Sequence, residues 1–385
     1  MTTRNSSEPG QRAERRRSLS FLAVASAIFF SGTWLAWGTW EHFWGRPIPW
    51  AWRIAPFALT ATFIVSLIAG LTHSNALIKV AYRVSATWLG VLNLGLFAAI
   101  GCWCIISVSK LLNLGLSGHF IALVLYGLAV VTSVGGVLNA AWLRVTRVTV
   151  RLPRLPAAWD GKEAVLITDL HLGNIRGAGF MRRVVNKVQS LKPYAIFIPG
   201  DMFDGPKGDY DRLIAPCRQL SAPAGVYFVT GNHEEFTDRS KYIAPIERAG
   251  LRVLNNEKVT VQGLQIVGVH DSEAVEPEQF KKILQAAGID ASQASILMVH
   301  RPSNLSIPEA AGISLQVSGH THKGQFWPWN WVIYKVHGPF AYGLNQFGNL
   351  LVLTSSGAGT WGPPMRVGTK SEIVLIRLER AAESP

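Results

Sequence analysis

The chain has 385 residues, a formal net charge of +13 and 49% hydrophobic residues. This length allows about two domains. Residues 1–150 contain 12 Lys or Arg and 3 Asp or Glu (net +9), whereas residues 151–385 contain 25 and 21 (net +4). The basic excess therefore lies in the hydrophobic part, which favours an anionic membrane surface and speaks against nucleic acid, because nucleic-acid binding requires a basic face on the soluble domain. Membrane insertion alone explains the same excess, since basic residues flank membrane spans.

Four long stretches before residue 145 contain no Lys, Arg, Asp or Glu: Ser18–Trp40, Ile54–Ile78, Val84–Ser109 and Leu111–Leu143. A membrane span needs about 20 mostly apolar residues, so each stretch is long enough. We therefore predict four transmembrane helices within residues 18–145 of an integral, multi-pass protein of the plasma or inner membrane. A disordered N-terminus over residues 1–17 precedes them, and a strand and linker over 146–162 lead into a soluble domain over 163–380.

Two clusters of arginine residues flank the predicted helices, one before and one after them: Arg12, Arg15, Arg16 and Arg17, then Arg144, Arg147, Arg151 and Arg154. Clusters of this kind stay in the cytoplasm, and an even number of spans puts both on one side. The soluble domain and the N-terminus are thus predicted to be cytoplasmic. The alternative is a twin-arginine export signal at Arg16-Arg17, which would place the domain outside. Three further spans and the lack of a small-residue cleavage site argue against it.

The soluble part alternates short buried-strand runs with amphipathic segments, which predicts a layered α/β domain. The predicted strands are Ala164–Thr168, Ala195–Pro199, Val226–Thr230, Ser295–Val299 and Leu315–Ser318. The predicted helices are Met181–Leu191, Tyr210–Leu220, Lys241–Ala249 and Pro277–Ala287.

Polar side chains follow each of these five strands directly: Asp169 and His171, then Asp201, Asn232 with His233, His300, and finally His320 and His322. In open α/β sheets, ligands bind outside the carboxyl ends of the strands, so the five segments can converge. Each segment alone has an ordinary explanation as a turn or a helix N-cap. Five of them in order, each at a strand end, favour a common site.

The residue types in this set indicate a metal centre. Carboxylates and imidazoles together suit Mn, Fe or Zn, and the absence of cysteine near them argues against a structural zinc site. Seven or eight ligands are too many for one ion. We therefore predict two divalent ions that share one carboxylate, the arrangement of a two-metal hydrolytic centre.

The motifs Asp169-x-His171, Gly200-Asp201-x-x-Asp204, Gly231-Asn232-His233-Glu234, the lone His300 and Gly319-His320-x-His322 resemble the calcineurin-like metallophosphoesterase family, and the tail after them is similar to its membrane-attached subgroup. The resemblance covers about Val148 to Leu378. It implies two packed β-sheets flanked by helices.

The resemblance also implies roles for the residues. The first ion would be held by Asp169, His171, Asp201 and His322. Asp201 would bridge to the second ion, which Asn232, His300 and His320 complete. His233 would contact the phosphate or protonate the leaving oxygen, and Asp204 would orient a neighbouring group. Lys323 departs from the pattern of the subgroup, which usually has Gly there; it is a candidate for contact with a substrate phosphate, and the alternative is a solvent-facing Lys. Arg366, in the tail, is a second candidate for contact with a substrate phosphate.

We therefore expect a membrane-anchored hydrolase of a phosphoester or pyrophosphate bond, with the bilayer and a phosphorylated substrate as its partners. The resemblance suggests a lipid-linked substrate such as UDP-2,3-diacylglucosamine. The alternatives are a soluble nucleotide, a protein phosphoester, or a non-catalytic membrane sensor. The aromatic segment from Phe326 to Trp331 is expected to dip into the membrane interface, where Trp is favoured. The alternative is a hydrophobic plug within the fold or against the membrane anchor.

Overall fold

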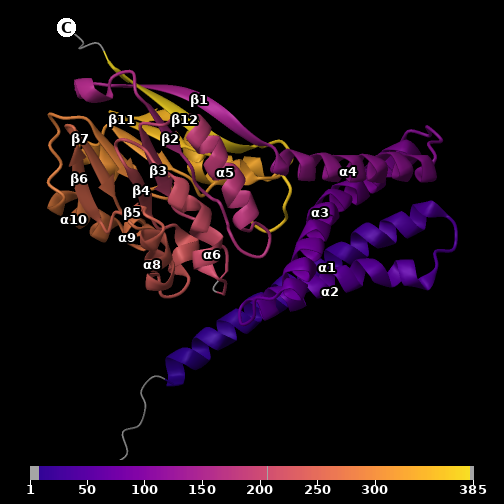
Figure 1. Cartoon of the computed structure of the whole chain (residues 1–385). Helices are drawn as coiled ribbons and strands as arrows, with labels where there is room; N and C mark the ends of the chain where they lie inside the picture. Colours follow the sequence, from indigo (N-terminus) through magenta and orange to yellow (C-terminus); the bar gives the residue numbers. More distant parts are fainter. Residues whose placement is uncertain (1–7, 206, 382–385) are drawn as a thin grey trace, which may run out of the picture. The chain divides into compact units, whose positions relative to one another are not determined.

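The computed structural model describes residues 8–205 and 207–381, and the chain divides into two compact units (Figure 1). The helical unit comprises Met1–Ala69 and Ala81–Val134, and the sheet unit comprises Gly70–Val80 and Gly135–Pro385.

Four helices fill the N-terminal part of the chain: α1 (Glu8–Trp44), α2 (Trp50–Gly70), α3 (Ala76–Leu111) and α4 (Gly118–Ala141). Among the described residues, these four are long and apolar enough to cross a membrane. The prediction of four apolar N-terminal helices is thus confirmed.

The first helix begins earlier than predicted. Helix α1 includes residues 8–17, which we expected to be disordered, while residues 1–7 of that predicted segment lie outside the described residues. The segment is rich in Arg, Glu, Gln and Ala, which have high helix propensity. Since the apolar part of α1 is already helical, extending it requires no new nucleation.

Two connections between the helices also differ from the predicted spans. Helix α2 ends at Gly70 and not at Ile78. The next helix, α3, is capped by the Asn75 side chain, which accepts a hydrogen bond from Ile78 N at 2.9 Å. Helices α3 and α4 are joined by a turn in which Asn113 and Gly115 have φ values of 53° and 63°. These breaks contain no charged residue, so a search for uncharged stretches could not find them.

Polar bonds join the helices within the helical unit. The hydroxyls of Thr33 on α1 and Thr60 on α2 are 2.8 Å apart, and the Trp88 indole on α3 donates to Thr60 Oγ1 at 3.0 Å. The Trp103 indole on α3 donates to Thr39 Oγ1 at 2.9 Å. Such bonds and small residues commonly hold apolar helices together, because lipid and leucine are equally apolar.

The sheet unit contains two six-stranded mixed sheets (Figure 1). The first has the order β1-β12-β2-β3-β4-β5, with bounds β1 Leu143–Leu152, β12 Ser371–Arg380, β2 Glu163–Leu166, β3 Ala195–Pro199, β4 Val226–Val229 and β5 Arg252–Val253. The second has the order β10-β11-β9-β8-β7-β6, with bounds β10 Gly343–Phe347, β11 Leu350–Thr354, β9 Leu315–Ser318, β8 Ser295–Met298, β7 Leu264–Gly268 and β6 Glu257–Val261. Strand β1 begins before the predicted boundary at residue 146.

In each sheet, four neighbouring strands run parallel, so their carboxyl ends lie at one edge. Strands β2, β3, β4 and β5 pair in parallel in the first sheet, and β7, β8, β9 and β11 do so in the second. All residues of β3 and β9 are buried, which explains why these strands read as continuous apolar runs in the sequence.

Helices cover the outer faces of the two sheets. Helices α5 (Ala178–Ser190), α6 (Tyr210–Ile214) and α8 (Ser240–Arg248) pack on the first sheet, and α10 (Pro277–Ala286) and α11 (Ser306–Ala310) pack on the second. Short helices α7 (Asn232–Glu235) and α9 (Asp271–Val275) and the 3₁₀ segment Ala215–Gln219 lie in the connections, and α12 (Asn330–His337) follows β9.

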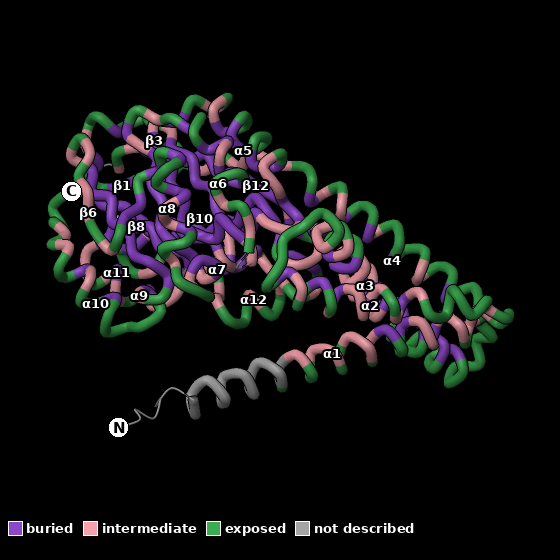
Figure 2. Tube along the Cα trace, turned by 60° about the horizontal axis from the view of Figure 1, so that its bottom comes forward, coloured by how far each residue is buried: buried purple, intermediate pink, exposed green. Residues whose placement is uncertain are grey.

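A central core lies between the sheets. It includes Leu166 and Phe197 from the first sheet and Ile266 and Leu315 from the second, all fully buried. Buried residues accordingly concentrate in the strands (Figure 2). The predicted fold of two packed β-sheets flanked by helices is confirmed.

Candidate metal centre

The predicted ligands converge at the carboxyl ends of five strands that belong to both sheets. Asp169 and His171 follow β2, Asp201 follows β3, and Asn232 opens α7 after β4 in the first sheet. The remaining three come from the second sheet, His300 after β8 and His320 and His322 after β9. The site thus lies where the carboxyl ends of the two sheets' strands meet, and neither sheet alone contains all of its residues.

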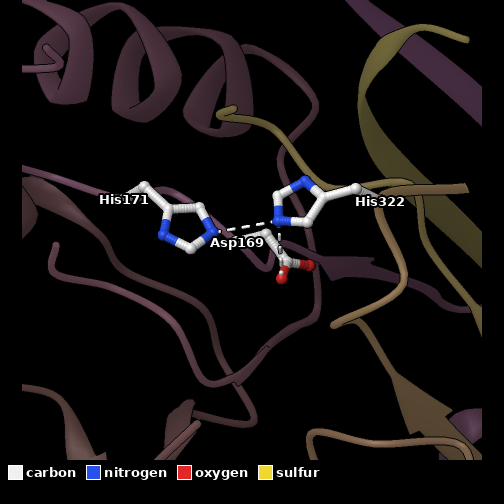
Figure 3. A group of neighbouring side chains, drawn as sticks. All are labelled: Asp169, His171 and His322. Atoms are coloured by element: carbon white, nitrogen blue, oxygen red, sulfur yellow. Dashed lines mark hydrogen bonds and ion pairs between the residues drawn. The ribbon is translucent and has the colours of Figure 1, made fainter. Parts of the chain in front are cut away.

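A first cluster consists of Asp169, His171 and His322 (Figure 3). The Nε2 atoms of the two histidines face each other at 3.0 Å, and His322 Nε2 is 3.5 Å from Asp169 Oδ1. All three side chains are buried. Two imidazole nitrogens and a carboxylate oxygen pointing to one place form a suitable donor set for a divalent transition metal.

A second cluster consists of Asp201, His300 and His320. His300 Nε2 lies 3.2 Å from Asp201 Oδ2. His300 Nδ1 is 2.8 Å from Pro199 O, to which it donates a hydrogen bond. This bond fixes the ring orientation, so that Nε2 is the ring nitrogen that faces the cluster.

The Asp201 carboxylate faces both clusters. Its Oδ2 atom lies 3.2 Å from His300 Nε2 of the second cluster and 3.7 Å from His171 Nε2 of the first. Its Oδ1 atom accepts a hydrogen bond from His233 N at 3.0 Å, which holds the carboxylate in this orientation. A carboxylate placed in this way is able to contact two ions at once.

The backbone is strained at most of the predicted ligands. Five of them have positive φ: Asp169 (54°), His171 (48°), Asp201 (52°), His320 (70°) and His322 (48°). Residues other than Gly rarely adopt this conformation, which costs of order 1–3 kcal/mol each and concentrates at functional sites. The strained backbone therefore lowers the stability of the fold, but it lets these side chains point into the site.

Two motif glycines allow the loops to approach the carboxylates closely. A Cβ atom on Gly231 would lie 2.2 Å from Asp201 Oδ1, and one on Gly319 would lie 2.3 Å from Asp169 Oδ2. Any side chain at these positions would displace a predicted ligand.

Glu234 supports the site and was not among the predicted site residues. Its carboxylate accepts backbone N–H groups from Asp201, Phe203 and Gly231, each at 2.9 Å. It therefore ties the loop after β3 to the loop after β4. Burial raises the pKa of Glu234 to about 7, with a further contribution from the charge of Asp201. Glu234 could have been singled out in the sequence, because it is the fourth residue of the motif Gly231-Asn232-His233-Glu234.

The pKa values at the site indicate that Asp201 is ionised and is stabilised by positive charge near it. Burial by itself would raise the pKa of Asp201, but His300, His171 and His233 hold it well below its usual range. Burial by itself would lower the pKa of His300, but Asp201 raises it to about 10. Burial lowers the pKa of His171 to about 4. A buried carboxylate that stays ionised among histidines is well matched to bound cations.

One buried oxygen atom at the site, Asn232 Oδ1, accepts no hydrogen bond from the described residues. Buried polar atoms are normally satisfied, so such atoms need an explanation. Ligation of metal ions supplies one, and the residues present thus fit a metal centre.

His233 and Asp204 form a pair at the edge of the clusters. His233 Nδ1 lies 3.2 Å from Asp204 Oδ1, and His233 Nε2 lies 4.0 Å from Asp201 Oδ2. Burial by itself would lower the pKa of His233, but Asp204 and Asp201 raise it to about 9. The role of Asp204 in orienting a neighbouring group stays a prediction.

The prediction that Arg366 contacts substrate phosphate is wrong. Arg366 is fully buried, and its guanidinium donates to the carbonyl oxygens of Gly359 at 2.8 Å and His322 at 3.2 Å. Its donors are occupied inside the fold, so they are not available to a substrate. Lys323 is half-buried, with Nζ 4.0 Å from the centre of the Tyr342 ring. Its contact with a substrate stays a prediction.

Comparison with known proteins identifies the class to which this fold and this set of side chains belong. The family model described as calcineurin-like phosphoesterase matches residues 164–324. A transmembrane protein with metallophosphoesterase domain from Danio rerio is 30% identical over 329 residues, covering 77% of this chain and 74% of that protein. The protein of the same name from Bos taurus is 34% identical over 272 residues, covering 65% and 61%. An uncharacterized metallophosphoesterase from Helicobacter pylori is 31% identical over 218 residues, covering 56% and 59%.

The chain belongs to the calcineurin-like phosphoesterase family. It spans less than two thirds of the length of the Bos taurus and Helicobacter pylori relatives. The family holds divalent metal ions, and the clusters described above are where this chain offers ligands for them.

We predict that replacing Asp201→Asn removes at least one of two bound ions, because the bridging carboxylate loses its charge. Metal content per chain, measured by mass spectrometry after dialysis of the purified full chain, should fall from about two to one or less. The matched control is Asp211→Asn, which changes an exposed carboxylate paired with Arg248 at 2.8 Å. Equal metal content in both variants would refute the bridging role.

Proposed function

We propose that this chain is a membrane-anchored phosphohydrolase that uses two divalent ions to cleave a phosphoester or pyrophosphate bond. The observation that carries the proposal is the position of Asp201, whose Oδ2 atom lies within 3.7 Å of histidines from both ligand clusters. A site with this shared carboxylate suits two ions about 3.5–4 Å apart, the spacing used for in-line displacement at phosphorus.

The ligands divide between the two proposed ions. Asp169, His171 and His322 would hold one ion, Asn232, His300 and His320 would hold the other, and Asp201 would serve both. Bound there, the ions would lower the pKa of water to make a nucleophile and neutralise charge on the phosphoryl oxygens. The candidate metals are Mn, Fe and Zn, because the donor set combines imidazole with carboxylate.

His233 is the proposed proton donor to the leaving oxygen. The Asp204 carboxylate lies 3.2 Å from Nδ1 and would accept its hydrogen, which turns Nε2 toward the clusters. A histidine oriented by a carboxylate is a common arrangement for general acid catalysis. Asp204 would act through His233 and would not touch the substrate.

The proposed substrate class is a lipid-linked pyrophosphate, with UDP-2,3-diacylglucosamine as the first compound to test. Four helices long enough to cross a membrane support a substrate in the bilayer. The basic residues Arg144, Arg147, Arg151 and Arg154, which follow α4 at once, support a cytoplasmic position for the sheet unit.

The first test is hydrolysis by the purified full chain in detergent with added Mn²⁺. The substrates are UDP-2,3-diacylglucosamine, bis-p-nitrophenyl phosphate and p-nitrophenyl phosphate, with release of nucleotide, phosphate or p-nitrophenol as the readout. We expect metal-dependent turnover that Asp201→Asn lowers by at least 100-fold, within the range that metal and acid–base groups contribute. Asp211→Asn should match the wild type. Metal binding without turnover of any substrate would overturn the hydrolase proposal.

His233→Ala should lower kcat about 10²–10⁴-fold on a phosphoester with an alkyl leaving group, because the departing alkoxide needs a proton. The loss should be much smaller on bis-p-nitrophenyl phosphate, because p-nitrophenolate leaves without a proton. Metal content should stay at the wild-type level. Loss of an ion in this variant, or an equal loss of kcat on both substrates, would assign His233 to metal binding or positioning instead of proton donation.

A further inference from the structure

An apolar surface, here called the aromatic face, lies on the segment that follows the last metal ligands. It consists of residues with large exposed side chains: Trp327 (50%), Trp329 (49%), Trp331 (61%), Val332 (49%) and Val336 (69%). Helix α12, which carries the last three, has no buried residue (Figure 2). A surface helix normally buries its apolar stripe, and an exposed apolar patch usually marks a binding site. These side chains therefore do not form a plug within the fold, and the alternative of a plug against the membrane anchor stays a prediction.

The aromatic face adjoins the metal centre. Helix α12 ends at His337, and the His337 ring lies 6.3 Å from the ring of His320, a residue of the second cluster. A molecule held on this face would thus have its polar end close to the proposed ions.

The aromatic face also adjoins the end of α4 within the sheet unit. Trp327 N donates to Val367 O at 2.8 Å. Arg366, which precedes Val367, donates its backbone N–H to Gly136 O at 2.9 Å. Asn139 Nδ2 donates to the carbonyl oxygens of Arg366 at 2.9 Å and Thr369 at 2.8 Å. The last turns of α4 are therefore hydrogen-bonded to the same short segment that pairs with Trp327.

The charges around this face favour an anionic surface. No Asp or Glu occurs between Glu309 and Glu372, whereas Lys335 lies on α12 itself. Directly after α4, the exposed Trp142 carries the Arg144 guanidinium 4.2 Å from its ring centre. Tryptophan combined with basic residues is the composition that membrane interfaces select.

We propose that the aromatic face docks into the interface of the membrane that α4 crosses, with phospholipids of anionic head group as its occupant. Docking would place the metal centre at head-group level, so that a phosphate carried by a lipid would reach it without leaving the bilayer. The docking itself does not depend on the proposed hydrolysis.

The test uses the full chain in nanodiscs of phosphatidylcholine and phosphatidylglycerol. In a Cys104→Ser background, which leaves Cys102 and Cys217 buried, Val336→Cys carries an environment-sensitive fluorophore. Lys282→Cys, at an exposed position on α10, carries the same label as a control. With nitroxide-labelled acyl chains in the disc, we expect several-fold stronger quenching at position 336 than at position 282. Equal quenching at both positions would overturn the inference.

A second pair of variants tests whether the aromatic side chains cause the docking. Trp331→Ser should reduce quenching at position 336, while Val275→Ser, which changes an exposed apolar residue on α9, should leave it unchanged. Discs without phosphatidylglycerol should also give weaker quenching. A label that is shielded because the chain dimerises, seen by light scattering, would assign the face to a second copy and contradict the proposal. Quenching needs no turnover, so an inactive but docked chain would count against the hydrolase alone.

Discussion

The position of the Asp201 carboxylate, which faces both ligand clusters, is the constraint on which the rest of the site depends. A single buried side chain has to face His171 from the first sheet and His300 from the second. This is possible only where the carboxyl ends of strands from two packed sheets meet. Glu234 fixes the loop that carries Asp201, and close glycine approaches leave no room for the carboxylates to move. The positive φ values at five ligands show that the fold accepts local strain to keep this geometry.

The same scaffold connects the metal centre to the end of α4. Arg366 donates from its guanidinium to the carbonyl of His322 and from its backbone to Gly136. One buried residue thus holds a predicted metal ligand and the last turns of a helix long enough to cross a membrane. Burial lowers the pKa of Arg366 to about 10, so it remains charged near neutral pH. The hydrogen bonds of Arg366 to His322 and Gly136 explain why this charged residue is buried without contact to substrate.

The sequence predicted much of this because the signals were local. Strands such as β3 and β9 are buried on both faces and read as unbroken apolar runs, and each predicted ligand stands directly after such a run. Edge strands such as β6 and β10 were not predicted, because they are only partly buried and lack that pattern. The buried strands β7 and β11 were not predicted either, although they do have an apolar run. The break at Asn75 was hidden because a helix cap need not be charged.

The roles of Arg366 and Glu234 could not be read from the chain alone. Whether a charged side chain points into the fold or toward substrate depends on residues distant in sequence, and for Arg366 these are Gly136 and His322. For Glu234, the partners lie on the loop after another strand. Such contacts appear only when the two loops are placed side by side.

The most direct test of the account is a crystal structure of the full chain grown with Mn²⁺, with anomalous difference density recorded for manganese. The account predicts two peaks about 3.5–4 Å apart on either side of the Asp201 carboxylate. One peak should contact Asp169, His171 and His322, and the other should contact Asn232, His300 and His320. A single peak, or two peaks of which only one contacts Asp201, would contradict the shared-carboxylate centre.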